Sequence, residues 1–192
     1  MPARRALSSL ALLAALAIAC AGPPDKELQQ AQAAIDAAKT AGADRYAVED
    51  FNAAQEALKQ ANDAVAQRDY RLALNHALDA RERAQSAAKD ATDRKAAVRS
   101  EAERAMVAIG PALSEAHTRL RAAEAARVGA RTLAEARHTI ASVEQAVQKA
   151  GAARDRGDYL EVVDLLKTAM PRLQGVAQDL QAAMPPGARR RH

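Results

Sequence analysis

The side chains that could carry chemistry in this sequence of 192 residues are a single cysteine and four histidines. Cys20 stands in the stretch LAIACAGPP, where a short apolar run gives way to glycine and proline. A lone cysteine at such a place is either a free thiol or the site of a covalent modification. The residues around it decide between these two interpretations.

The histidines offer one pattern with the spacing of a metal site. Glu135 and His138 form a Glu-x-x-His pair, which di-iron bundles use on their helices together with a second such pair and further glutamates. The sequence contains no second pair, His76 and His117 have no partner at ligand spacing, and His192 ends the chain. It also contains no glycine-rich phosphate loop, nucleophile elbow or cysteine–histidine pair. We therefore expect no enzyme, no metal site and no bound cofactor.

The residues before Cys20 have the pattern of a secretion signal. Arg4 and Arg5 form a basic start, and residues 6–19 form a 14-residue apolar segment that ends in small side chains. This segment is shorter than the roughly 20 apolar residues that span a bilayer. We expect residues 1–19 to be a signal peptide, and residues 20–24 to be a lipidated tether that follows it.

Residues 17–20 resemble the lipobox of bacterial lipoproteins, in which a small residue precedes a cysteine that receives diacylglycerol before cleavage. Ala17 departs from the usual leucine, and an ordinary signal peptidase would also cut before Cys20. The resemblance implies diacylglycerol and an acyl chain on Cys20, which would hold the protein on a membrane. Ala21 and Gly22, in place of an aspartate after the cysteine, indicate the periplasmic side of the outer membrane by analogy with enterobacterial sorting.

Charge and aromatic content exclude one class of partner. The chain has 28 basic and 24 acidic residues, but two arginines lie in the signal and three in the tail, so the body has 23 against 24. With one Phe, three Tyr and no Trp, it lacks the basic face and stacking aromatics of nucleic-acid binders. We expect no nucleic-acid partner. Arg189, Arg190 and Arg191 are either a solubilising tail or a contact for an anionic surface, such as lipid headgroups or cell-wall polymer, that salt would weaken.

Alanine dominates the composition, with 53 residues, and predicts an all-α fold. Alanine is the best helix former, but it removes little area from water, so we expect a thin core. Apolar periodicity predicts about six long antiparallel helices, arranged as helical hairpins or as a bundle. Their approximate ranges are 28–41, 47–67, 70–109, 111–127, 132–157 and 158–184.

Glycine, proline and capping residues predict how these helices are grouped. Gly110 and Pro111 interrupt the pattern, so we expect one repeat over residues 25–109, a second over 111–184 and a flexible basic tail over 185–192. Asp69 is the expected N-cap of the third helix. Capping boxes would start the fifth helix at Thr132 and the sixth at Asp158. Within the sixth, Pro171 predicts a kink or a break.

The predicted third helix is unusually polar between residues 79 and 104. This stretch carries many charged residues, and Val98 is its one large aliphatic residue. We therefore expect a solvated flank rather than core. The pairs Asp79–Arg83 and Asp90–Arg94 have the i to i+4 spacing of helix ion pairs.

The two halves of the chain resemble each other, which predicts an internal repeat. Residues 41–70 align with residues 128–159, so that Tyr46 matches Leu133 and the pair Asp69-Tyr70 matches Asp158-Tyr159. The Gly-Asp-Tyr stretch at 157–159 also resembles the second helix of a tetratricopeptide hairpin, in hairpin geometry only.

The first copy resembles a known family, catalogued as domain of unknown function 4398, over roughly residues 28–100. The residues that carry the resemblance are Ala41-Gly42-Ala43, Tyr46-Ala47, Glu49-Asp50, Asp69-Tyr70, Ala73 and Ala77, with Val48 where the family usually has proline. The family occurs in secreted and lipid-anchored proteins of Gram-negative bacteria. The resemblance implies an all-helical envelope protein and brings no catalytic residue with it.

These observations predict a non-catalytic, lipid-anchored periplasmic protein that acts as an envelope spacer or a protein-interaction adaptor. Its expected partners are a membrane, through the anchor, and an envelope protein or cell-wall polymer, which would contact the exposed face of the third helix. The alternative is a carrier or sensor of a lipid or other amphiphile, bound between helices that a thin core would let open. The sequence leaves the oligomeric state open.

Overall fold

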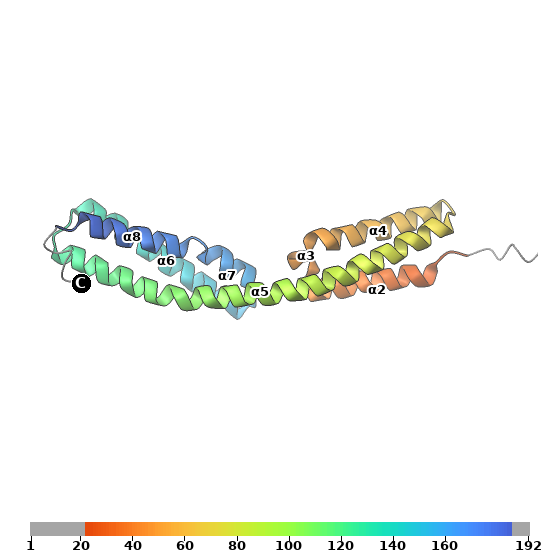
Figure 1. Cartoon of the computed structure of the whole chain (residues 1–192), viewed down its shortest axis with the longest axis horizontal. Coiled ribbons are helices and arrows are strands. Elements are labelled where there is room, and N and C mark those ends of the chain that lie inside the picture. The colour runs from red at the N-terminus through yellow and green to blue at the C-terminus, as the bar shows by residue number, and fades with distance from the viewer. Residues whose placement is uncertain (1–21, 186–192) are drawn as a thin grey trace, which may run out of the picture. The chain divides into compact units, whose positions relative to one another are not determined.

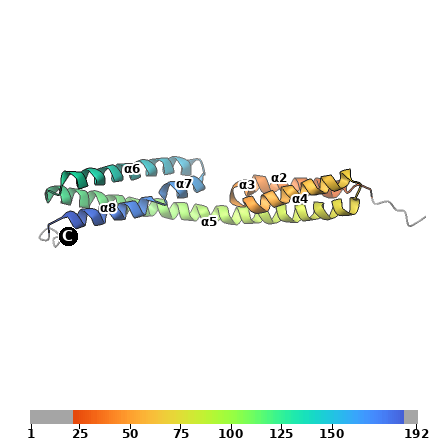
Figure 2. The same cartoon turned by 90° about the horizontal axis from the view of Figure 1, so that it is seen from above.

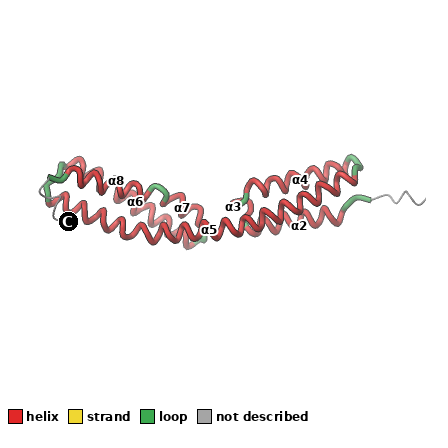
Figure 3. The backbone as a smooth tube through the Cα atoms, viewed as in Figure 1, coloured by secondary structure: helices red, strands yellow, loops and turns green. Residues whose placement is uncertain are grey.

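The computed structural model describes residues 22–185, and the regular structure in this range is α-helical throughout (Figures 1 and 3). The helices are α2 (Asp25–Ala41), α3 (Ala43–Tyr46), α4 (Val48–Ala66), α5 (Tyr70–Ala125), α6 (Ala130–Asp155), α7 (Tyr159–Leu166) and α8 (Ala169–Ala183). The predicted all-α class is confirmed. The chain divides into two compact units, an N-terminal unit that ends at Arg94 and a C-terminal unit that begins at Lys95.

The N-terminal unit consists of α2, the short α3, α4 and the first part of α5. These helices alternate in direction, so that the start of α2 lies at the same end of the unit as the turn between α4 and α5 (Figures 1 and 2). Arg81 on α5 donates a hydrogen bond to the side-chain oxygen of Gln30 on α2 over 2.7 Å, which joins these two helices. Because successive long helices alternate in direction, the predicted antiparallel arrangement is present within this unit.

Alanine fills most of the interior of the N-terminal unit. Of its eighteen buried hydrophobic residues, fourteen are alanine, and the larger exceptions are Ile35, Tyr46, Phe51 and Leu58. The buried alanines of α5 alternate at spacings of four and three, which is the heptad spacing of helices packed side by side. They are Ala73, Ala77, Ala80, Ala84, Ala87 and Ala91.

This alanine stripe corrects the prediction of a solvated flank over residues 79–104. Ala80, Ala84, Ala87 and Ala91 are all fully buried, so the first half of that stretch is core. Charged residues lie between these alanines in the sequence, and no large apolar side chain accompanies them. The sequence pattern therefore did not indicate that this helix face is buried. Residues 92–97 are exposed, as predicted.

The C-terminal unit consists of the remainder of α5 with α6, α7 and α8, and it has a core of larger side chains. Of its nineteen buried core residues, seven are alanine and twelve are Ile, Leu, Val or Met. Among them are Leu120, Leu133, Ile140, Leu166 and Leu180. Because larger side chains remove more apolar area from water, each buried position contributes more to stability here than in the N-terminal unit.

The predicted helix break at Gly110 and Pro111 is wrong. Both residues lie inside α5, which continues as one helix of 56 residues, and the boundary between the units falls at Arg94. A proline inside a helix removes one hydrogen bond and presses against the carbonyl group four residues earlier, here that of Val107. Pro111 is exposed and Val107 is 78% exposed, so water can reach the carbonyl group that loses its partner.

Three of the helix ends share one backbone motif. At the end of α4, the amide of Asp69 donates to the carbonyl oxygen of Ala64 and the amide of Arg68 donates to that of Val65, each over 2.9 Å. Arg68 takes a positive φ of 61°. The same pair of bonds closes α5, with Arg127 at a φ of 56°, and α6, with Gly157 at 76°. This is the Schellman motif, in which a left-handed residue follows the helix.

The helix starts agree with two of the three predicted caps. The carboxylate of Asp69 accepts from the amide of Leu72 over 3.0 Å, and that of Asp158 accepts from the amide of Glu161 over 3.2 Å. The capping box at Thr132 is wrong, because α6 begins at Ala130 and no side chain caps it. The predicted interruption of the last helix is confirmed. It falls between α7 and α8, just before Pro171 in the first turn of α8.

The aligned stretches of the two halves occupy corresponding places in the two units. Tyr46 and Leu133 are both buried, and Asp69 and Asp158 both cap the helix that follows. Each unit therefore has a helix, a turn to a second helix and a capped start of the next. Gly42 departs from this correspondence, since its φ of 91° lets α3 form before α4 begins.

Candidate functional site

Two of the predicted sites lie outside residues 22–185. Cys20, with its predicted lipid, precedes this range, and Arg189, Arg190 and Arg191, with their predicted anionic contact, follow it. Both stay predictions from the sequence.

One of the two histidines predicted to have no partner at ligand spacing, His117, contacts a glutamate of another helix. Nε2 of His117 on α5 lies 2.8 Å from Oε1 of Glu144 on α6, and both side chains are partly exposed. Glu135, of the Glu-x-x-His pair, accepts instead from Arg131 on its own helix over 2.9 Å. Within the described residues, no group of three His, Cys, Asp or Glu side chains lies close enough to hold a metal ion.

The charged side chains of the described residues lie at the surface. Most of the ion pairs among them join residues of a single helix. The predicted pair Asp79–Arg83 forms, with Nε of Arg83 2.8 Å from a carboxylate oxygen of Asp79. The hydrogen bond to Asp79 raises the pKa of Arg83, and the hydrogen bond to Asp93 likewise raises the pKa of Lys89. Exposed pairs of this kind contribute little to stability, so their main effect is a solvated surface.

The second predicted pair, Asp90–Arg94, is replaced by a different contact. Nη1 of Arg94 donates to the backbone carbonyl oxygen of Tyr46 over 3.1 Å. The acceptor lies 48 residues earlier in the chain, at the end of α3, so no local spacing could have predicted it.

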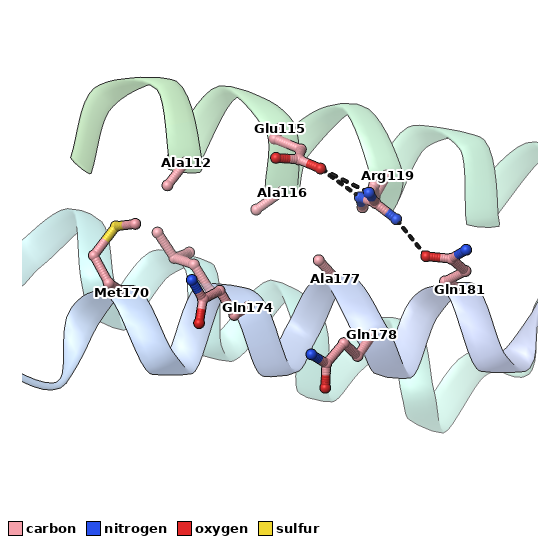
Figure 4. Close-up of a pocket in the computed structure, with 10 residues that line it drawn as sticks. Ala112, Glu115, Ala116, Arg119, Met170, Gln174, Ala177, Gln178 and Gln181 are labelled. Carbon is pink, nitrogen blue, oxygen red and sulfur yellow. Dashed lines mark hydrogen bonds and ion pairs between the residues drawn. The ribbon is translucent and has the colours of Figure 1, made fainter. Parts of the chain in front are cut away.

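An open groove runs between α5 and α8 in the C-terminal unit (Figure 4). It encloses about 250 Å³, and small side chains on both helices leave this space free, among them Ala112, Ala116 and Ala177. Leu173 lies at its base and is buried, whereas the rim is polar. The residues that line it are Ala112, Glu115, Ala116, Arg119, Met170, Leu173, Gln174, Ala177, Gln178 and Gln181.

Arg119 is the most constrained polar side chain of this groove. Its guanidinium donates to Oε1 of Glu115 over 2.9 and 2.7 Å and, through Nη1, to Oε1 of Gln181 over 2.8 Å (Figure 4). The second contact bridges α5 and α8, whose residues are 62 positions apart. Sequence reasoning missed it because a glutamine carries no charge pattern that would mark it as the partner of a distant arginine.

The groove offers hydrogen-bonding chemistry around an apolar floor. Gln174, Gln178 and Gln181 present side-chain amides, which can both donate and accept hydrogen bonds. Glu115 and Arg119 neutralise each other, so the rim carries no net charge. Such a surface suits a polar, uncharged segment of a partner better than it suits a strongly charged ligand.

A second groove lies between α2 and α4 in the N-terminal unit and encloses about 320 Å³. Ile35 and Leu58 form its apolar part, and amide and charged side chains surround them. Its full lining is Gln32, Ile35, Gln55, Leu58, Lys59, Asn62 and Asp63.

Comparison with known proteins gives one match. The model of a family described as a domain of unknown function (DUF4398) matches residues 26–105, which confirms the resemblance seen over residues 28–100. No curated protein and no solved structure matches the chain. Among the helices of residues 22–185, none combines the length and apolar character that crossing a membrane requires.

Proposed function

Residues 26–105 belong to the DUF4398 family, and from this premise we propose that the protein is a non-catalytic, lipid-anchored adaptor or spacer of the bacterial envelope. In this proposal, diacylglycerol and an acyl chain on Cys20 hold it on the periplasmic side of the outer membrane. The helical body then binds an envelope protein or a cell-wall polymer.

The observation that carries the adaptor role is the groove between α5 and α8. Arg119 is held by Glu115 and Gln181, so its position is set before any partner arrives. A side chain that is already ordered loses little entropy on binding, which favours affinity. The surrounding glutamine amides can pair with the backbone or side chains of a polar segment.

The adaptor role can be tested by crosslinking intact cells with a short amine-reactive reagent, followed by mass spectrometry of the purified protein. We expect one dominant envelope protein or cell-wall fragment attached to the wild type, and a clear loss with Arg119→Ala. Arg121→Ala is the matched control, because Arg121 is an exposed arginine on the same helix that does not line the groove. Equal crosslinking of both variants would exclude the groove as the partner site.

The anchor is tested separately through Cys20, which is the sole cysteine of the chain. We expect palmitate labelling and membrane fractionation of the wild type, and loss of both in Cys20→Ala. Ala21→Asp should keep the label but retain the protein in the inner membrane, because it introduces the aspartate that, by analogy with enterobacterial sorting, signals retention there. An unchanged membrane fraction in Cys20→Ala would overturn the anchor.

One observation favours the alternative role of an amphiphile carrier or sensor. The interior of the N-terminal unit is mostly alanine, so separating its helices exposes less apolar area than a core of leucine would. Native mass spectrometry of the Cys20→Ser protein purified from cells decides this. A reproducible lipid adduct would support the carrier, and its absence would leave the adaptor as the proposed role.

A further inference from the structure

α2 contributes less to the core of the N-terminal unit than its neighbour α4 does. It has three buried residues over 17 positions, and Ile35 is the large one among them, beside Ala31 and Ala38. α4 has six buried residues over 19 positions, including Phe51 and Leu58. Because the burial of apolar area holds packed helices together, α2 is held in the unit less tightly than α4.

The boundary of α2 with α4 and α5 is open to water. Arg81 on α5 donates to Gln30 on α2 over 2.7 Å, and both side chains are partly exposed, so water can replace this bond. The groove between α2 and α4 leaves about 320 Å³ free beside Ile35 and Leu58. No side chain caps the start of α2. A helix with few buried apolar contacts and solvated bonds opens before the rest of its domain does.

Gly42 joins α2 to a segment that is held in place from several sides. Ala43 and Tyr46 of α3 are buried, and Arg94 on α5 donates to the backbone carbonyl oxygen of Tyr46 over 3.1 Å. Gly42 itself has no Cβ atom and takes a φ of 91°, so its backbone can rotate where that of another residue would be strained. A rotation at this position moves α2 and leaves α3, α4 and α5 where they are.

From these observations we propose that α2 is a detachable arm. It separates from α4 and α5 as one unit about Gly42, while α3, α4 and α5 stay folded. The docked state is the major one, because it buries Ile35 and two alanines. Once detached, α2 loses its protection against solvent, since an isolated helix of this length is only marginally stable in water.

The arm sets the reach of the anchor, a consequence that rests on the proposed lipid at Cys20. α2 begins five positions after Cys20. While α2 is docked, its start lies at the end of the unit where α4 turns into α5, so the lipid keeps that end near the membrane (Figures 1 and 2). While α2 is detached, the unit is attached through Gly42 instead, and 17 residues of helix add about 26 Å to the tether. A spacer built in this way has a short and a long state.

Amide hydrogen exchange measures the opening in solution, on the chain from residue 20 onward with Cys20→Ser. We expect residues 29–41 to exchange with one common opening constant, and the amides of α4 to be at least about 10-fold more protected. A protection that rises steadily from Asp25 toward Gly42 would indicate fraying from the end of the helix and would overturn the proposal. Equal protection of α2 and α4 would overturn it as well.

Two substitutions distinguish opening of the arm from unfolding of the whole unit. Ile35→Ala should raise the opening constant of α2 about 100-fold, because it removes the large side chain that docking buries. Arg94→Ala is the matched control, since the contact that it removes is still present when α2 alone has opened. It should speed the exchange of α4 about fivefold and leave that of α2 unchanged. If Arg94→Ala speeds both helices alike, α2 opens only with the whole unit and the proposal is wrong.

A crosslink between the arm and α5 provides an independent measurement. Gln30→Cys and Arg81→Cys replace two side chains that contact each other, and a short bis-maleimide joins them in the Cys20→Ser protein, which has no other cysteine. The link should slow the exchange of α2 to the level of α4, compared with the same protein without the link. Unchanged exchange of α2 would mean that it unfolds in place rather than detaching. Because no lipid is present, failure of the arm is distinguishable from failure of the anchor, which Cys20→Ala tests.

Discussion

Arg94 donates a hydrogen bond from Nη1 to the backbone carbonyl oxygen of Tyr46, 3.1 Å away, and so joins α5 to the end of α3. Tyr46 is itself buried, and its ring lies against Gly42, where the chain leaves α2. The two residues therefore close the end of the N-terminal unit at which α2 passes into α3 and α4.

Arg94→Ala should lower the free energy of unfolding by about 1 kcal/mol, because a hydrogen bond from a charged donor to a largely buried residue is lost. Urea unfolding followed by far-UV circular dichroism measures this change. Lys95→Ala is the control, since Lys95 is the exposed neighbour and should be near neutral. If both variants unfold alike, the contact to Tyr46 contributes nothing measurable.

Gly42→Ala should destabilise the N-terminal unit by about 1 kcal/mol or more, because an L residue is strained at the φ of 91° found there. A Cβ atom at this position would also lie 3.2 Å from Cδ2 of Tyr46. Gly151→Ala is the contrasting variant, since Gly151 lies inside α6 with open space around its Cα. It should gain about 0.5–1 kcal/mol in the same unfolding experiment. A loss for Gly151→Ala would contradict this explanation.

Arg127→Gly should stabilise the protein, because Arg127 takes a positive φ of 56° at the end of α5. Relief of this left-handed strain should stabilise the folded state by about 1–2 kcal/mol. The greater conformational freedom of glycine in the unfolded chain should offset about 0.5–1 kcal/mol of that gain. Gly157→Ala makes the opposite change in the same motif at the end of α6 and should destabilise. Thermal unfolding of the two variants should shift the melting temperature in opposite directions.

Pro111→Ala should stabilise α5 by up to about 3 kcal/mol, because it restores the hydrogen bond to the carbonyl group of Val107 and removes the clash of the ring. Pro171→Ala is the control, since Pro171 lies in the first turn of α8, where a missing amide hydrogen matters little. The difference between their unfolding midpoints is the quantity to measure. A destabilised Pro111→Ala protein would show that the proline has a favourable contact outside its helix.

Ala84→Leu should destabilise the N-terminal unit by about 1–3 kcal/mol, since it adds three carbon atoms to a fully buried position between close helices. Ala97→Leu places the same side chain on an exposed position of the same helix and should change stability by less than about 0.5 kcal/mol. Urea unfolding of both proteins makes the comparison. Similar midpoints would mean that the alanine stripe of α5 is not tightly packed.

Local signals in the sequence predicted the helices well where a side chain acts on its own backbone. Asp69 and Asp158 cap their helices as expected, because an aspartate needs only the amides of the next turn to do so. Thr132 has the same kind of signal but lies inside α6, since the helix had already begun at Ala130. A capping residue acts only where the chain has another reason to start a helix.

The candidate site was less accessible to sequence reasoning than the fold. Arg119 and Gln181 meet across the groove although 62 positions separate them, and Arg94 reaches Tyr46 over 48. Neither contact follows a periodicity or a charge pair, so each depends on which helix faces are brought together. Cys20 is the converse case, because its predicted modification depends on the residues next to it.

By itself, the sequence determined that this chain is helical, where several of its helices begin and end, and that a family resemblance covers its first half. These properties follow from alanine, glycine and aspartate acting within one or two turns. Only the tertiary structure decided that α5 continues through Pro111 and that its alanines from 73 to 91 form core. Both depend on the surroundings of the helix. A neighbouring helix buries small side chains such as alanine, and on the exposed face water can bond to the carbonyl group that a proline leaves without a partner.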